Sequence, residues 1–290
     1  MSNKKAQLLQ NPNLQKYLVD NKEALRNYLL EVETDLLTKD VNTEGRFGKI
    51  KAKVSLELDL AKNPPVIANI SNMLESCFPG YTLTGGSEIF VGRDAPLMEH
   101  TDSGIFVNTG RSMALQLWVL LDFFERDNPD ATPEENLALE CVLPPITGVM
   151  YPGDTASLTP TGIIEFPHDE IIGGASMVAG DILLFSNNVR HRKPPGTKGV
   201  LRFAMAQRFT RTQEPDDVAD KNFVKWLAKE MRVRPELDQR WAATNPYYER
   251  MRPMLADLDE DIDLSKCTKI DLNDYEALGV ALSTAPIKPL

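Results

Sequence analysis

The chain has 290 residues, of which 42% are hydrophobic, and its formal net charge at pH 7 is −10. This composition is typical of a globular protein with a substantial core, and the acidic balance argues against nucleic acid as a partner, because proteins that bind it depend on clustered Lys and Arg. The three cysteines lie far apart without a CxxC spacing, which fits a reducing compartment, and the sequence has neither an apolar signal core nor a membrane-spanning apolar run. We therefore expect a cytoplasmic protein that does not act at a membrane.

The first eighty residues favour helices. Apolar residues recur at spacings of three, four and seven over 13–38, which predicts an amphipathic helix with Pro12 near its start. Residues 49–60 alternate in part and indicate a strand, and a second helical stretch runs from Pro64 to the stop at Pro79. We interpret residues 1–80 as an N-terminal helical support.

From residue 81 the pattern changes to short apolar or alternating runs that are separated by Gly, Pro, Asn and Asp, as in an all-β sandwich or barrel. The dense turn residues of 147–174 are typical of segments that cover active sites. Beyond residue 213 the pattern is helical again. The sequence thus predicts one domain with a β core over 81–212 and a C-terminal helical extension over 213–290, and the predicted core strands are 87–92, 96–102, 112–124, 137–143, 176–185 and 200–210.

A histidine and a carboxylate stand two residues apart at the end of a predicted strand, as His100 and Asp102. Side chains at i and i+2 of a strand project to the same face, so this pair supplies two ligands of a metal site. Of the two other histidines, His191 is the better third ligand because it follows a buried apolar strand, whereas His168 resembles a surface-loop residue. Two histidines and one carboxylate with open positions form a ligand set that favours non-haem iron(II).

The predicted strand over 200–210 places Arg202, Ala204, Ala206 and Arg208 on one face, opposite Phe203, Met205, Gln207 and Phe209. Small residues beside an arginine are unusual in a filled core. They make sense if this face lines a cavity in which the Arg202 fork holds a carboxylate. The face of 112–124 that carries Gln116 and Trp118 is a second candidate pocket wall.

Together these residues resemble the iron(II)- and 2-oxoglutarate-dependent oxygenases, specifically the phytanoyl-CoA dioxygenase-like branch. The resemblance rests on the HTD of residues 100–102, on Gly180-Asp181 with the apolar strand leading to His191, and on Arg202 eleven residues later. Trp118, eighteen residues after His100, and the strand 139–143 before Pro144 agree with it. It covers residues 87–209 and excludes the terminal helices.

The resemblance implies a double-stranded β-helix, or jelly roll, of the cupin-like kind, with flanking helices. It implies that His100, Asp102 and His191 ligate iron(II), that Arg202 binds the distal carboxylate of 2-oxoglutarate, and that Trp118 and Thr101 line that pocket. The reaction would use O₂ and release succinate and CO₂. Hydroxylation is the leading expectation, and desaturation, epoxidation or ring closure would need only another substrate pose. An aspartate at position 102 disfavours a halogenase.

The chain departs from that branch at residues 144–147, where Pro-Pro-Ile-Thr replaces Pro-Gly-Ser-His. The substrate-facing region is therefore expected to be remodelled, and coenzyme A thioesters are not assumed. A small molecule such as a specialised metabolite or an amino-acid derivative is the expected substrate. Two alternatives stay open: a cupin-like metalloenzyme that does not use 2-oxoglutarate, and a non-catalytic jelly-roll ligand-binding protein. The amphipathic terminal helices are expected either to cover the barrel or to form a homodimer interface.

Overall fold

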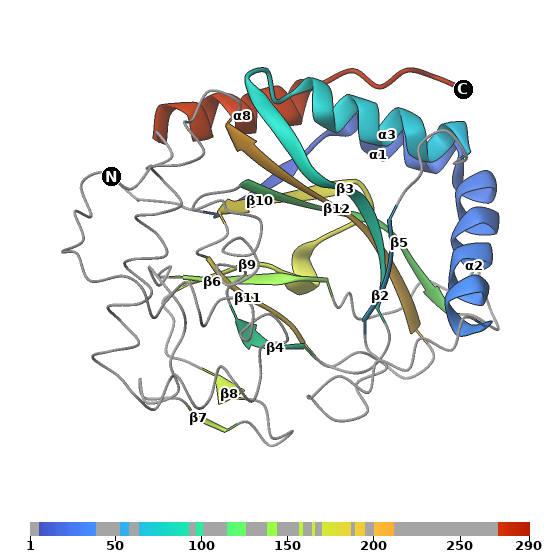
Figure 1. Cartoon of the computed structure of the whole chain (residues 1–290), viewed down its shortest axis with the longest axis horizontal. Coiled ribbons are helices and arrows are strands. Elements are labelled where there is room, and N and C mark those ends of the chain that lie inside the picture. The colour runs from blue at the N-terminus through green and yellow to red at the C-terminus, as the bar shows by residue number, and fades with distance from the viewer. Residues whose placement is uncertain are drawn as a thin grey trace, which may run out of the picture.

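Two antiparallel sheets form the centre of the protein in the computed structural model (Figure 1). The structure describes residues 6–38, 53–57, 64–92, 97–100, 115–125, 138–143, 157–158, 164–165, 170–186, 189–194, 200–211 and 272–290. In spatial order, the large sheet contains β1 (Ala6–Gln10), β10 (Asp181–Ser186), β5 (Leu115–Glu125), β12 (Val200–Arg211), β3 (Tyr81–Gly92) and β2 (Lys53–Glu57). The small sheet contains β4 (Leu97–His100), β11 (Arg190–Lys193), β6 (Glu140–Leu143) and β9 (Glu170–Gly173), and a hairpin pairs β7 (Ser157–Leu158) with β8 (Ile164–Glu165).

The strand order is that of a double-stranded β-helix. Taken along the chain, the eight core strands are β3, β4, β5, β6, β9, β10, β11 and β12. The first, third, sixth and eighth lie in the large sheet, and the others lie in the small sheet. The chain therefore crosses repeatedly between two facing sheets, which is the jelly-roll arrangement. The predicted fold class is confirmed, and β1 and β2 extend the large sheet at its two edges.

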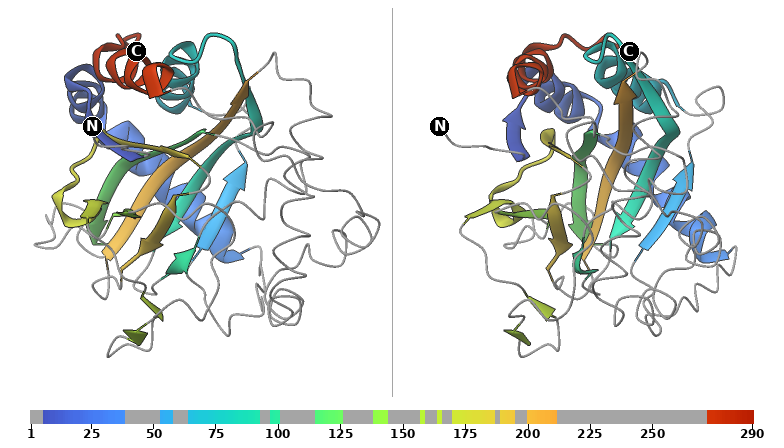
Figure 2. Two further views of the ribbon diagram at one scale, coloured as in Figure 1. Left: turned by 90° about the vertical axis from the view of Figure 1, so that its left-hand side faces the viewer. Right: turned by 60° about the vertical axis from the view of Figure 1, so that its left-hand side comes forward.

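Four described helices accompany the sheets: α1 (Pro12–Asp20), α2 (Lys22–Thr38), α3 (Pro65–Ser76) and α8 (Leu272–Thr284). The single helix predicted over 13–38 is wrong, because Asn21 ends α1 by donating from its side chain to the Tyr17 carbonyl at 2.8 Å. Figures 1 and 2 show α1, α3 and α8 grouped together, with α2 running along the large sheet on the side away from the small sheet. Within the described part of the chain, no helix is long and apolar enough to cross a membrane.

The large sheet separates two apolar clusters. The first fills the space between this sheet and the helices, with Leu29, Ile70 and Phe203 among its fully buried members. The second lies between the two sheets and includes Trp118 and Ala206. Alternate residues of β5 and β12 belong to opposite clusters, so the predicted alternation along these strands is confirmed.

Strand β10 begins later than the predicted start at residue 176. Residues 174–176 form a 3₁₀ turn, and Gly180 follows with φ of +94°, in the region that favours glycine. A Cβ at Gly180 would lie 2.7 Å from Cγ of Gln15 in α1. The Asp181 carboxylate accepts hydrogen bonds from the Gln15 amide and the Val178 N–H, both at 2.9 Å. The Gly-Asp pair therefore fixes α1 to the start of β10.

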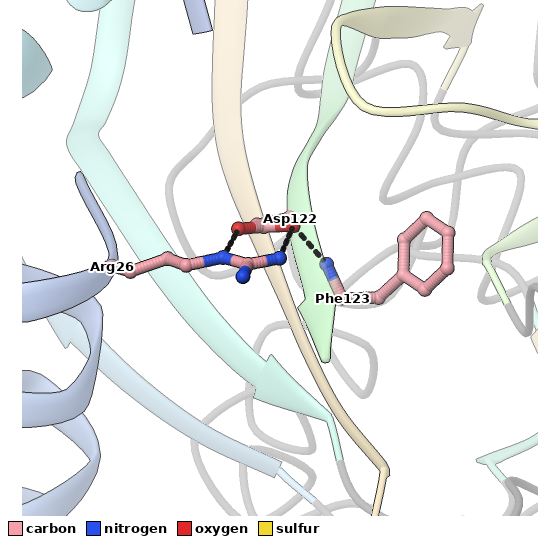
Figure 3. Close-up of polar contacts among 3 residues, drawn as sticks. All are labelled: Arg26, Asp122 and Phe123. Atoms are coloured by element: carbon pink, nitrogen blue, oxygen red, sulfur yellow. Dashed lines mark hydrogen bonds and ion pairs between the residues drawn. The ribbon is translucent and has the colours of Figure 1, made fainter. Parts of the chain in front are cut away.

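A β-bulge changes the direction of side chains near the end of β5. Phe203 of β12 pairs with Asp122 and Ala204 pairs with Leu120, so Leu121 is an extra residue in β5. Asp122 consequently faces the helices, where it accepts from Arg26 of α2 at 2.5 and 3.3 Å (Figure 3). The ring of Phe123 points away from that ion pair, and it packs against the cluster between the sheets.

Candidate active site

His191 occupies the second position of β11 in the small sheet, and its ring is buried with 5% exposure. Its Nδ1 lies 3.1 Å from the Val189 carbonyl oxygen. A carbonyl only accepts, so Nδ1 carries the proton and the ring lone pair is on Nε2. This hydrogen bond is the kind that orients a metal-ligating histidine and fixes its tautomer.

The small sheet brings two of the three predicted ligand positions together. In the register of β11 and β4, His191 lies directly opposite His100. Directly paired positions of an antiparallel sheet share a face. Asp102 and Thr101 lie outside the described residues, as does the loop histidine His168, and the side chain of His100 is not described. The complete iron triad therefore stays a prediction.

Cys141 of β6 is paired with His191 on the other side of β11. The thiol is fully buried between the sheets, and burial raises its pKa. The group is consequently a neutral thiol at ordinary pH, and it contributes packing beside His191 rather than a thiolate ligand.

Arg202 is the most unusual residue of the site. It has 5% exposure and faces the space between the sheets from the start of β12. Its buried Nη1 has no hydrogen-bond partner among the described residues, and burial alone lowers the pKa of the guanidinium to about 10. No carboxylate of the described residues pairs with it. A buried cation without a counter-charge is costly, so this group suits an anionic ligand.

Gly92 makes room for this guanidinium. It is paired with Arg202 in the register of β3 and β12, and a Cβ there would lie 2.7 Å from Nη2 of Arg202. On the other side Arg202 is paired with Phe123, which the bulge turns toward the space between the sheets. Neither neighbour was predicted from the sequence. The glycine at the end of an apolar strand was an available signal of close approach, whereas regular alternation would place residue 123 on the opposite face.

Trp118 lies in the cluster between the sheets with 9% exposure, and it is paired with Ala206 of β12 and Leu183 of β10. Gln116 shares this face and has 5% exposure. The predicted pocket wall of β5 therefore faces the same space as Arg202.

No family model matches the chain, and no curated protein matches it. Among solved structures, it is similar to the epimerase SnoN in complex with Fe³⁺, alpha ketoglutarate and nogalamycin RO, at 13% identity and a TM-score of 0.42, over 74% of this chain and 83% of that chain. It is similar to the non-heme alpha ketoglutarate dependent carbocyclase SnoK from nogalamycin biosynthesis, at 14% identity and a TM-score of 0.42, over 71% and 79%. A third similar structure is EctD from S. alaskensis with 2-oxoglutarate and 5-hydroxyectoine, at 13% identity and a TM-score of 0.42, over 71% and 72%.

Proposed function

We propose that this protein is a non-haem iron(II)- and 2-oxoglutarate-dependent dioxygenase that oxidises a small organic molecule. The observation that carries the proposal is the buried Arg202 guanidinium, which lies over Gly92 inside a jelly roll and has no carboxylate partner among the described residues. A structural arginine would normally be paired with an acid. A bidentate fork that faces the interior of the fold instead suits the distal carboxylate of a dicarboxylic cosubstrate.

The residues also fit the metal. His191 presents the lone pair of Nε2 because its Nδ1–H is held by the Val189 carbonyl. His100 stands at the paired position, and Asp102 follows two residues later in the sequence. These three residues would hold iron(II), and Arg202 would hold 2-oxoglutarate with Trp118 and Thr101 beside it. When bound, iron(II) and 2-oxoglutarate supply the activation of O₂, with one oxygen atom entering the substrate and the other entering succinate as CO₂ leaves.

The protein's own groups then have three tasks. The fork of Arg202 orients the cosubstrate, the hydrogen bond from His191 fixes a ligand ring, and the apolar cluster around Trp118 excludes water. Hydroxylation of a C–H bond is the proposed outcome, and a specialised metabolite or amino-acid derivative is the proposed substrate class.

The test is an anaerobic titration of the metal-free protein with iron(II) and then 2-oxoglutarate, followed by the visible metal-to-ligand charge-transfer absorption. We expect the band in the wild type, no band in His191→Ala, and a band that requires far more 2-oxoglutarate in Arg202→Met. His168→Ala is the matched control for the histidine. Arg192→Met is the matched control for the arginine, because Arg192 pairs with Glu140 at 2.7 Å. Both controls should give the wild-type band.

An iron-loaded wild type without the band would refute the use of 2-oxoglutarate. Iron binding without 2-oxoglutarate binding would then favour a cupin-like metalloenzyme, and the absence of both would favour a ligand-binding protein.

A further inference from the structure

Two buried N–H donors on the inter-sheet face of the large sheet are not used by the proposed roles. Among the described residues, the buried Nε2 of Gln116 has no hydrogen-bond partner. The buried Nε of Arg208 likewise has no partner among them. Native proteins satisfy nearly all of their buried donors, so two such groups in one region point to an acceptor that the described part of the chain does not supply.

These donors are immediate neighbours. Gln116 of β5 lies directly opposite Arg208 in the register with β12. Directly paired residues of an antiparallel sheet share a face, with Cβ atoms about 5 Å apart. The next pair on this face is Trp118 with Ala206, and both belong to the cluster between the sheets. The two donors therefore project from adjacent positions of one face.

The pair lies on the His191 side of this face. Gln116 is paired with Phe185 of β10, and the Phe185 ring centroid lies 5.2 Å from that of His191. Arg202 stands six residues earlier than Arg208 along β12, which corresponds to about 20 Å of extended strand. The two donors therefore form a site that is distinct from the guanidinium proposed for 2-oxoglutarate.

The local charge selects the kind of acceptor. Nη1 of Arg208 donates to Oε2 of Glu88 at 2.8 Å, so the positive charge of Arg208 is already balanced. Gln116 is neutral. An incoming carboxylate would lie near the negative charge of Glu88, and the Arg208 cation is already paired with that residue. A carbonyl oxygen can accept hydrogen bonds from Gln116 and Arg208 without adding a second negative charge.

We propose that Gln116 and Arg208 form a subsite for a neutral carbonyl group, such as a ketone, amide or ester, of the organic substrate. The subsite holds that group beside His191 and so sets which part of the molecule approaches the metal. The role as a substrate subsite rests on the proposed function, but the binding of a carbonyl by these two donors does not.

The test uses the full-length protein labelled with [¹⁵N]glutamine, once metal-free and once loaded with Zn(II) and 2-oxoglutarate. The probe is cyclopentanone, and acetate is the anionic comparison. The side-chain NH₂ signal of Gln116 is identified by its absence in Gln116→Met. We expect cyclopentanone to move this signal downfield in a saturable manner in both samples, and to bind more tightly than acetate. The metal-free sample keeps this result separate from any failure of iron or 2-oxoglutarate to bind.

Gln116→Met should raise the Kd for cyclopentanone about fivefold, the usual worth of one neutral hydrogen bond, and Arg208→Met should raise it by at least as much because its donor is charged. Gln207→Met is the matched control. Gln207 is a buried neighbour on the opposite face of β12, where its amide donates to Ser71 and Ser87, and the variant should keep the wild-type Kd. A Gln116 signal that does not move with cyclopentanone, or an unchanged Kd in both site variants, would overturn the subsite. Tighter binding of acetate would overturn its assignment to a neutral group.

Discussion

Replacing Arg202 by Met should stabilise the ligand-free protein while removing its response to 2-oxoglutarate. Arg202 is 5% exposed, and the described residues give its guanidinium no counter-charge. Met keeps much of the apolar volume of the side chain but has no charge to bury. Arg202→Met should therefore gain stability without ligand and lose stabilisation by 2-oxoglutarate. An arginine with a purely structural role would not give this combination.

The magnitude follows from the desolvation of the charge. Burial lowers the pKa of Arg202 from the ordinary value of a guanidinium to about 10. At 1.36 kcal/mol per pH unit, this change corresponds to roughly 3 kcal/mol of penalty on the charged form. The loss of packing beside Phe123 offsets part of it, so we expect Arg202→Met to raise the free energy of unfolding of the ligand-free protein by about 1–2 kcal/mol.

The assay is urea unfolding of wild type, Arg202→Met and Arg202→Lys, each anaerobically with iron(II) and with or without 2-oxoglutarate. At a hundred times its Kd, a ligand that binds only the folded state adds about 2.7 kcal/mol. We expect that gain in the wild type and none in Arg202→Met. Arg202→Lys keeps the charge but not the bidentate fork. It should therefore retain the cost of burying a charge and lose most of the stabilisation by 2-oxoglutarate.

A ligand-free Arg202→Met that is less stable than the wild type by more than about 1 kcal/mol would show that the fold supplies a partner for the guanidinium. A full 2-oxoglutarate response in this variant would remove Arg202 from the cosubstrate site.

Three further predictions concern the scaffold. Asp122→Ala breaks a nearly buried ion pair with Arg26 and should lower the free energy of unfolding in urea by about 3 kcal/mol. The control Asp20→Ala removes an exposed i,i+4 ion pair and should lower it by less than about 1 kcal/mol. Equal losses would contradict the proposal that the bulge in β5 directs Asp122 into a stabilising ion pair. Gly180→Ala should lower the free energy of unfolding by about 2 kcal/mol more than Gly80→Ala does. Both glycines have positive φ, but of the two only Gly180 lies where a Cβ would collide with a neighbour. Similar losses in the two variants would be inconsistent with the contact between Gly180 and α1. Burial raises the pKa of the Asp181 carboxyl group, so the folded state binds its proton more tightly than the unfolded state does. The stability that this proton contributes is lost as pH rises through the folded pKa. The urea midpoint of the wild type should therefore fall more steeply above pH 4 than that of Asp181→Asn, and parallel profiles would argue against a raised pKa at Asp181.

The alternation of residues along single strands was determined by the sequence. Period-two patterning placed Ala204 and Ala206 on the same face as Arg202, and it separated Trp118 from Leu117, as the two apolar clusters confirm. This succeeded because the direction of a side chain along a regular strand depends only on the local backbone. The run of short strands likewise favoured an all-β sandwich or barrel, and the family resemblance specified a jelly roll.

Local patterning failed where the backbone leaves its regular repeat. The amide of Asn21 splits one amphipathic stretch into two helices, and the extra residue in β5 turns Asp122 toward α2 and Phe123 toward Arg202. A bulge is hard to detect from hydrophobic periodicity, because it inserts only one residue and the side chains on either side of it still face suitable surroundings.

Only the tertiary structure decided which distant positions meet. The register of β11 puts His191 opposite His100, and that of β12 puts Arg208 opposite Gln116. Pairing between strands far apart in the sequence is set by the closure of the whole barrel and by the packing of both clusters, so no local pattern can specify it. The sequence therefore identified the residues of the proposed site. The fold determined that the Arg202 guanidinium inside it has no carboxylate partner among the described residues.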